Sequence, residues 1–151
     1  MNKTNFLSAI FLILLGVVGR FFLIHYVSIP NFEIITALTL VSAVFLGRFW
    51  ALVVPLSIIA ITDAVIGNNS VMLFTWSAFA IIGVIGWLFS KLKVESRKLK
   101  VLGLTGIGIA SSVFFFLYTN FGWWLVSAMY PYTLAGLIQC YFMGLPFFKN
   151  N

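Results

Sequence analysis

Long apolar segments alternate with short polar ones along almost the whole chain, as in proteins that cross a membrane several times. A helix that crosses a bilayer needs about 20 mostly apolar residues, with a range of about 17 to 25. We therefore predict an all-α integral membrane protein, a single domain in which six transmembrane helices form one compact bundle. The predicted spans are approximately residues 6–26, 30–47, 49–66, 71–90, 101–118 and 131–148.

Local signals set several of the predicted helix ends. Pro30 opens the second span, since proline suits a first helical turn, and Glu33 just inside it suits the positive end of the helix dipole. The Gly-Asn-Asn-Ser turn at residues 67–70 ends the third span. Residues 119–130 are too few to span and aromatic enough for the membrane interface. We predict that they form an interfacial segment between the fifth and sixth spans.

The segment 91–100 holds five of the nine basic residues of the chain. Short loops rich in Lys and Arg stay on the cytoplasmic side of a membrane. Six spans with this loop inside place both termini in the cytoplasm, and Lys3, Arg48 and Lys149 then fall on the same side. Among the basic residues only Arg20 lies elsewhere, within the first span. We predict a multi-pass protein of a plasma membrane with both termini cytoplasmic.

The composition excludes several classes of function. The chain is 62% hydrophobic and 8% charged, far from the composition of soluble domains. Its net charge of +6 does not indicate nucleic-acid binding, because the basic residues lie in loops and at the termini. One cysteine and one histidine are too few for a disulfide framework or a Cys/His metal site. Without a phosphate loop or a hydrolase motif, we expect no enzyme, no cofactor and no nucleic-acid partner.

The rare polar residues gather in the half of the predicted bundle that lies away from the basic loop. Arg20 is near the outer end of the first span, and Asp63 is near the outer end of the third. Ionisable groups in a bilayer usually face the protein interior or a water-filled cavity. We therefore predict an outward-facing, aromatic-lined cavity that binds a small molecule. Its candidate residues are Arg20, Glu33, Asp63, Asn68, Asn120, Trp123, Trp124, Tyr130 and Gln139.

Most of these residues also have a purely structural interpretation. An ion pair between Arg20 and Asp63 would hold two spans together without any ligand, although a paired Arg and Asp can also form the floor of a cavity. Glu33 suits a helix N-terminus, and the aromatic side chains suit an interfacial belt. Both interpretations stay open for the site. We predict that Arg20 and Asp63 approach each other, because each would otherwise be an unpaired charge below the interface.

Three stretches of the chain resemble a known group of proteins. They are Pro30-Asn31-Phe32, Pro55 with Asp63 and Gly67, and Met129–Leu137 running on to Pro146–Asn150. The group is a family of small uncharacterised bacterial membrane proteins that is similar to the substrate-binding S components of energy-coupling-factor (ECF) transporters. The resemblance covers about residues 30–150.

That resemblance implies a substrate-binding subunit of the bacterial inner (plasma) membrane, serving uptake of a vitamin or similar micronutrient. Besides the small-molecule substrate and the lipid bilayer, the implied partners are a transmembrane coupling protein and two ATPases. The first span lacks the Ala-x-x-x-Ala spacing with which S components often contact the coupling protein. The alternative is a membrane scaffold similar to the small rod-shape-determining membrane protein. A closed, fully packed outer half would favour the scaffold.

Overall fold

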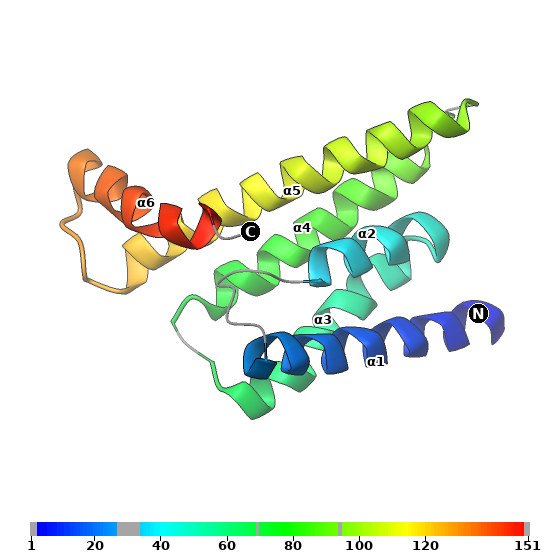
Figure 1. Cartoon of the computed structure of the whole chain (residues 1–151), viewed down its shortest axis with the longest axis horizontal. Helices are drawn as coiled ribbons and strands as arrows, with labels where there is room; N and C mark the ends of the chain where they lie inside the picture. Colours follow the sequence, from blue (N-terminus) through cyan, green and yellow to red (C-terminus); the bar gives the residue numbers. More distant parts are fainter. Residues whose placement is uncertain (1–2, 27–33, 69, 94, 150–151) are drawn as a thin grey trace.

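The computed structural model describes residues 3–26, 34–68, 70–93 and 95–149, which form six helices (Figure 1). Their bounds are α1 Lys3–Tyr26, α2 Ile35–Phe45, α3 Arg48–Ile66, α4 Met72–Ser90, α5 Arg97–Val126 and α6 Leu134–Lys149. By length and composition, α1, α3, α4 and α5 are able to cross a membrane, whereas α2 and α6 are shorter apolar helices. The fold is therefore all-helical and compatible with a multi-pass membrane protein.

The predicted end of the fifth span near residue 118 is wrong, because α5 continues to Val126 and includes most of the segment 119–130. The Oγ1 of Thr119 and the Nδ2 of Asn120 each donate to the carbonyl oxygen four residues earlier, at 2.7 and 2.8 Å. These polar side chains are thus satisfied along the helix itself. No proline lies between the start of α5 and Pro131, so none ends the helix at residue 118.

Two other helix starts differ from the predictions, and a third predicted start lies outside the described residues. The α5 helix begins inside the basic segment, at Arg97, where the Ser96 hydroxyl accepts the Leu99 N–H at 3.5 Å. The α6 helix begins a few residues after Pro131, at Leu134. The predicted start of the second span at Pro30, with Glu33, lies outside the described residues.

The helices α1 to α4 enclose the main hydrophobic core, at whose centre are Val54, Ile58 and Ile59 of α3 and Ile82 of α4. Small residues bring these helices close together. A Cβ added to Gly83 would collide with the carbonyl oxygen of Ala51, so α3 and α4 are in close contact there. The α2 helix packs against α3 and α4 with its buried face.

The last two helices extend this core on one side. The α5 helix packs on α4 and in part on α2, and α6 folds back along the last part of α5. Among the described helices, α6 contacts α5 alone. The space between α6 and the start of α4 is therefore not filled by another described helix.

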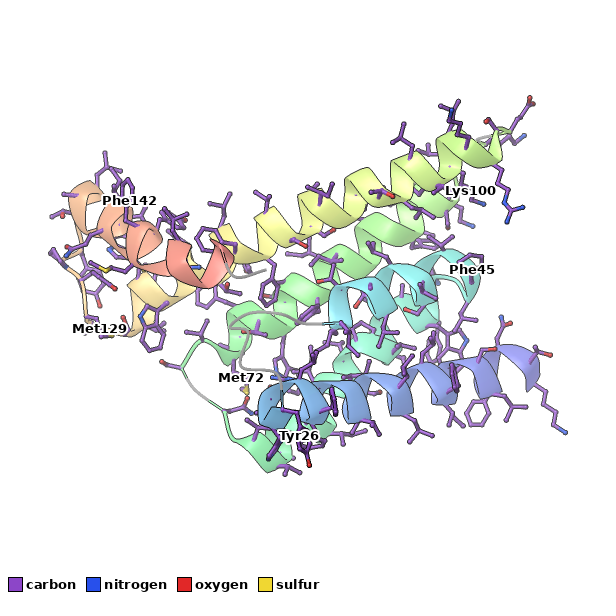
Figure 2. The ribbon with its side chains drawn as sticks, viewed as in Figure 1. Tyr26, Phe45, Met72, Lys100, Met129 and Phe142 are labelled. Atoms are coloured by element: carbon purple, nitrogen blue, oxygen red, sulfur yellow. The ribbon has the colours of Figure 1, made fainter. Side chains whose placement is uncertain are left out.

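Successive helices run in opposite directions and define two ends of the molecule (Figure 1). The start of α1, the α2–α3 junction and the α4–α5 loop lie at one end, which we call the basic end. The end of α1, the α3–α4 loop and the α5–α6 turn lie at the opposite end. Figure 2 shows Lys100 and Phe45 at the basic end, and Tyr26, Met72 and Met129 at the opposite end.

Candidate functional site

The predicted ion pair between α1 and α3 is present. The Nη1 of Arg20 lies 2.8 Å from Oδ1 of Asp63, and it also donates to the Oγ1 of Thr62 at 2.5 Å. Only 7% of the Asp63 side chain is exposed, against 24% for Arg20. The Thr62 hydroxyl donates in turn to the Ile58 carbonyl at 2.8 Å, so it is free to act as an acceptor for the guanidinium.

A third helix joins this pair through Trp76, which sequence reasoning missed. Its indole Nε1 donates to Oδ2 of Asp63 at 3.0 Å, so both carboxylate oxygens have a partner. We call Arg20, Thr62, Asp63 and Trp76 the polar cluster. A signal for Trp76 was present, because a buried indole N–H needs an acceptor. The short α3–α4 connection also places the last turn of α3 beside the first turns of α4.

A second site lies at the same end of the molecule, between the start of α4, the second half of α5 and α6. It is an open cleft of about 800 Å³. The cleft is lined by Val71, Thr75, Phe115, Thr119, Asn120, Trp123, Tyr130, Cys140, Met143 and Gly144. The structure thus brings together three of the predicted site residues, namely Asn120, Trp123 and Tyr130.

Hydrogen bonds between α5 and α6 hold the floor of the cleft in place. The Cys140 thiol donates to the Asn120 carbonyl at 3.5 Å, and the Tyr141 hydroxyl donates to the Leu117 carbonyl at 3.1 Å. Gly144 lies so close to the Asn120 side chain that a Cβ there would be 2.6 Å from Oδ1. The two helices therefore form one continuous floor for the cleft.

The chemistry of the cleft lining is neutral. Phe115, Trp123 and Tyr130 supply aromatic surface, and none of the lining residues carries a charge. The hydroxyls of Thr75 and Thr119 each donate to a carbonyl of their own helix, at 3.4 and 2.7 Å, which leaves their oxygens available as acceptors. Such a lining suits an uncharged molecule with a ring and a few hydrogen-bond donors.

The other predicted site residues lie outside the cleft. Arg20 and Asp63 belong to the polar cluster, and Trp124 binds the α5–α6 turn, where its Nε1 donates to the Pro131 carbonyl at 3.0 Å. Asn68 is exposed in the α3–α4 loop, and Gln139 is exposed on α6. Glu33 lies outside the described residues. The single predicted cavity is therefore divided into two neighbouring sites.

The two sites meet along α4. Trp76 of the polar cluster follows Thr75 of the cleft directly in the chain, so the ion pair fixes the position of one cleft wall. Several lining residues, including Cys140 and Met143, were not predicted, because apolar residues on a helix resemble ordinary packing residues. Within the described parts of the chain, no group of three or more His, Cys, Asp or Glu side chains is placed to hold a metal ion.

These features define the class of protein: an all-helical chain with several helices long enough to span a membrane and a neutral cleft at one end. The chain belongs to a family of unknown function (DUF6580), which matches residues 1–151. No curated protein and no solved structure matches the chain. The family carries no assigned activity, so the functional argument rests on the cleft.

Proposed function

We propose that this protein is a substrate-binding membrane subunit that takes up a vitamin or similar micronutrient, and that the substrate is an uncharged, ring-containing molecule. The cleft between α4, α5 and α6 carries the proposal. Its volume of about 800 Å³ lies within the range of about 300–1,000 Å³ that small-molecule sites occupy. Apolar and aromatic walls with a few fixed polar groups are also typical of such sites.

The position of the cleft supports binding from outside. The basic segment 91–100 lies at one end of the bundle, and the positive-inside rule places that end in the cytoplasm. The cleft lies at the opposite end, beside the α3–α4 loop and the α5–α6 turn. In this orientation it opens towards the side from which a nutrient arrives.

An open cleft favours a binding subunit over the scaffold alternative. A scaffold needs no ligand site, and a packed outer half would have supported it. Uphill transport would require an energy source outside this chain, so a transmembrane coupling protein and ATPases remain part of the proposal. The small residues of α1 pack inside the bundle rather than forming a contact surface for a coupling protein, since a Cβ at Gly16 would collide with Ile58 of α3. A coupling protein would therefore contact a surface other than these small residues.

The proposal is tested by purifying the full chain in a mild detergent and identifying retained small molecules by mass spectrometry. We compare the wild type with Thr75→Trp, which fills the cleft, and with Trp123→Ala, which removes an aromatic wall. Leu73→Trp is the matched control, because Leu73 is 73% exposed on the same turn of α4 and does not line the cleft.

We expect a neutral, ring-containing compound in the wild type and in the control, and at least about tenfold less in both cleft variants. Loss of one buried aromatic anchor typically costs 2 kcal/mol or more, which is consistent with such a change. A compound retained equally by the wild type and both cleft variants would show that it binds elsewhere.

A further inference from the structure

A second concave surface lies at the basic end, between α2 and α5. It is a groove of about 390 Å³. The groove is lined by Thr36, Ala37, Leu40, Val41, Val44 and Phe45 of α2 and by Leu104, Thr105, Gly108 and Ser112 of α5. Figure 2 shows that Phe45, at one end of this lining, lies at the same end of the molecule as Lys100.

The length of the groove matches one leaflet of a bilayer. Its lining covers residues 36–45 of α2 and 104–112 of α5. At a rise of about 1.5 Å per residue, these stretches are about 12 to 14 Å long. The hydrocarbon core of a bilayer is about 30 Å thick, so each leaflet contributes about 15 Å. The groove therefore extends from the basic end to about the middle of the membrane.

Its surface suits a hydrocarbon chain. Six of the ten lining residues have aliphatic or aromatic side chains, and the two hydroxyls on α5 are satisfied within their own helix. Thr105 donates to the Val101 carbonyl at 3.1 Å, and Ser112 donates to the Gly108 carbonyl at 3.2 Å. An apolar chain in the groove would thus leave neither of these hydroxyl donors without a partner.

Two cations lie on the same face of α5 as the groove. Each helical residue turns by about 100°, so Arg97 lies about 20° from the groove residues Leu104 and Gly108. Lys98 lies about 20° from Thr105 and about 40° from Ser112, whereas Lys100 lies about 140° and about 120° from these two residues. All three basic side chains are exposed. The segment 91–100 contains five basic residues and one acidic residue, so its charge is strongly positive.

We propose that this groove binds an anionic phospholipid of the cytoplasmic leaflet, with one acyl chain between α2 and α5 and the headgroup phosphate at Arg97 and Lys98. Guanidinium and ammonium groups form charge-assisted hydrogen bonds with phosphate oxygens. Basic pockets beside transmembrane helices on the cytoplasmic side commonly hold anionic headgroups. Charge complementarity thus selects the occupant, and the groove gives the acyl chain a defined position.

The neighbouring groove between α1 and α2 is a weaker candidate. It has a volume of about 440 Å³ and shares Val41 and Phe45 with the first groove. At the basic end, α1 provides one cation to this groove, Lys3, which lies a turn before Leu7. With two cations on its groove face, α5 provides the stronger headgroup site.

The headgroup contact is tested with the full chain reconstituted in nanodiscs of equal parts phosphatidylglycerol and phosphatidylcholine, followed by native mass spectrometry of the lipids retained. The double variant Arg97→Gln/Lys98→Gln is compared with Lys93→Gln/Lys100→Gln, which removes the same charge from the same segment. We expect the preference for phosphatidylglycerol to fall by about fivefold per cation in the first variant. It should change little in the control.

The acyl-chain contact is tested with two leucine substitutions on one helix. At Gly108 a Cβ would have an ordinary contact of 3.9 Å with Leu40, and at Gly106 it would meet nothing within 4 Å, so both variants should fold. Gly108→Leu fills the groove, whereas Gly106 is outside it. Thermal unfolding confirms that both variants are folded.

We expect Gly108→Leu to lose the retained phospholipid and Gly106→Leu to keep it. An equal loss of lipid preference in both charge variants would mean diffuse attraction to the basic segment and would overturn the site. If Gly108→Leu retained as much phospholipid as the wild type, the lipid site would be overturned as well. The same holds if Gly108→Leu lost a co-purifying protein rather than lipid.

Discussion

Arg20 of α1 and Asp63 of α3 are paired at 2.8 Å, and Trp76 of α4 donates to the other carboxylate oxygen of Asp63 at 3.0 Å. Side chains from three helices therefore meet at one carboxylate. Because Thr75, next to Trp76, lines the cleft, this arrangement connects the stability of the bundle to the shape of the candidate binding site.

Removing one member of the ion pair should destabilise the protein more than removing both. Asp63→Leu alone leaves the Arg20 guanidinium without its counter-ion, and a loss of this kind costs about 3–5 kcal/mol. The double variant Arg20→Met/Asp63→Leu leaves neither charge uncompensated, so it should unfold at a higher temperature than the single variant. Thermal unfolding in detergent measures both. A double variant that is less stable than either single variant would contradict the pairing.

Trp76→Phe should destabilise the protein while keeping most of the aromatic surface. The substitution removes the donor to Oδ2 of Asp63 and leaves a buried acceptor unpaired, which costs about 1–3 kcal/mol. Trp87→Phe is the control, since Trp87 lies on the same helix with Lys91 Nζ 5.6 Å from its ring centre. We expect a lower unfolding temperature for Trp76→Phe than for Trp87→Phe, and equal effects would argue against the hydrogen bond.

The close approach of α3 and α4 predicts opposite effects of the same substitution at two glycines. Gly83→Ala places a methyl group against the Ala51 carbonyl, and overpacking of this kind costs about 1–3 kcal/mol. Gly106→Ala adds its methyl group in open space, so the gain in helix propensity should make it neutral or stabilising by up to about 1 kcal/mol. Unfolding temperatures of the two variants distinguish these outcomes.

Trp123 and Trp124 are neighbours with different roles. Trp124 donates to the Pro131 carbonyl at 3.0 Å, so Trp124→Phe should destabilise the α5–α6 turn by about 1 kcal/mol. Trp123 lines the cleft, so Trp123→Phe should lower affinity for the retained ligand with little change in stability. The two variants are compared by ligand titration and thermal unfolding. If Trp123→Phe lowered stability and Trp124→Phe lowered affinity, the roles given to the two residues would be wrong.

The helices could be predicted from sequence because apolar segments of span length are separated by clear polar breaks. The failure at residues 119–130 has a local cause. Aromatic residues suit both a membrane interface and a helix, and Thr119 and Asn120 satisfy their own polar groups by bonding to the backbone. Composition alone does not distinguish these two structures.

Part of the site could be predicted from the sequence, namely the ion pair and the three cleft residues Asn120, Trp123 and Tyr130. Two opposite charges in apolar helices indicated the pair of Arg20 and Asp63, and the structure contains it. The division into a polar cluster and a separate cleft depends on which helices are neighbours. Sequence patterns do not show that, among the described helices, α6 packs on α5 alone, which is why Trp124 and Gln139 were placed in the site together with Trp123.

The central claim is that the cleft opens outside while the basic segment lies in the cytoplasm, and paired cysteine labelling tests it most directly. Cys140 is the one native cysteine, so Met143→Cys and Ser96→Cys are each made in a Cys140→Ala background. Met143 lines the cleft and is 57% exposed. A membrane-impermeant maleimide is applied to intact cells and to opened cells. We predict labelling of position 143 in both and of position 96 only in opened cells. Labelling of position 96 in intact cells, with position 143 protected, would contradict the orientation and the proposed uptake from outside.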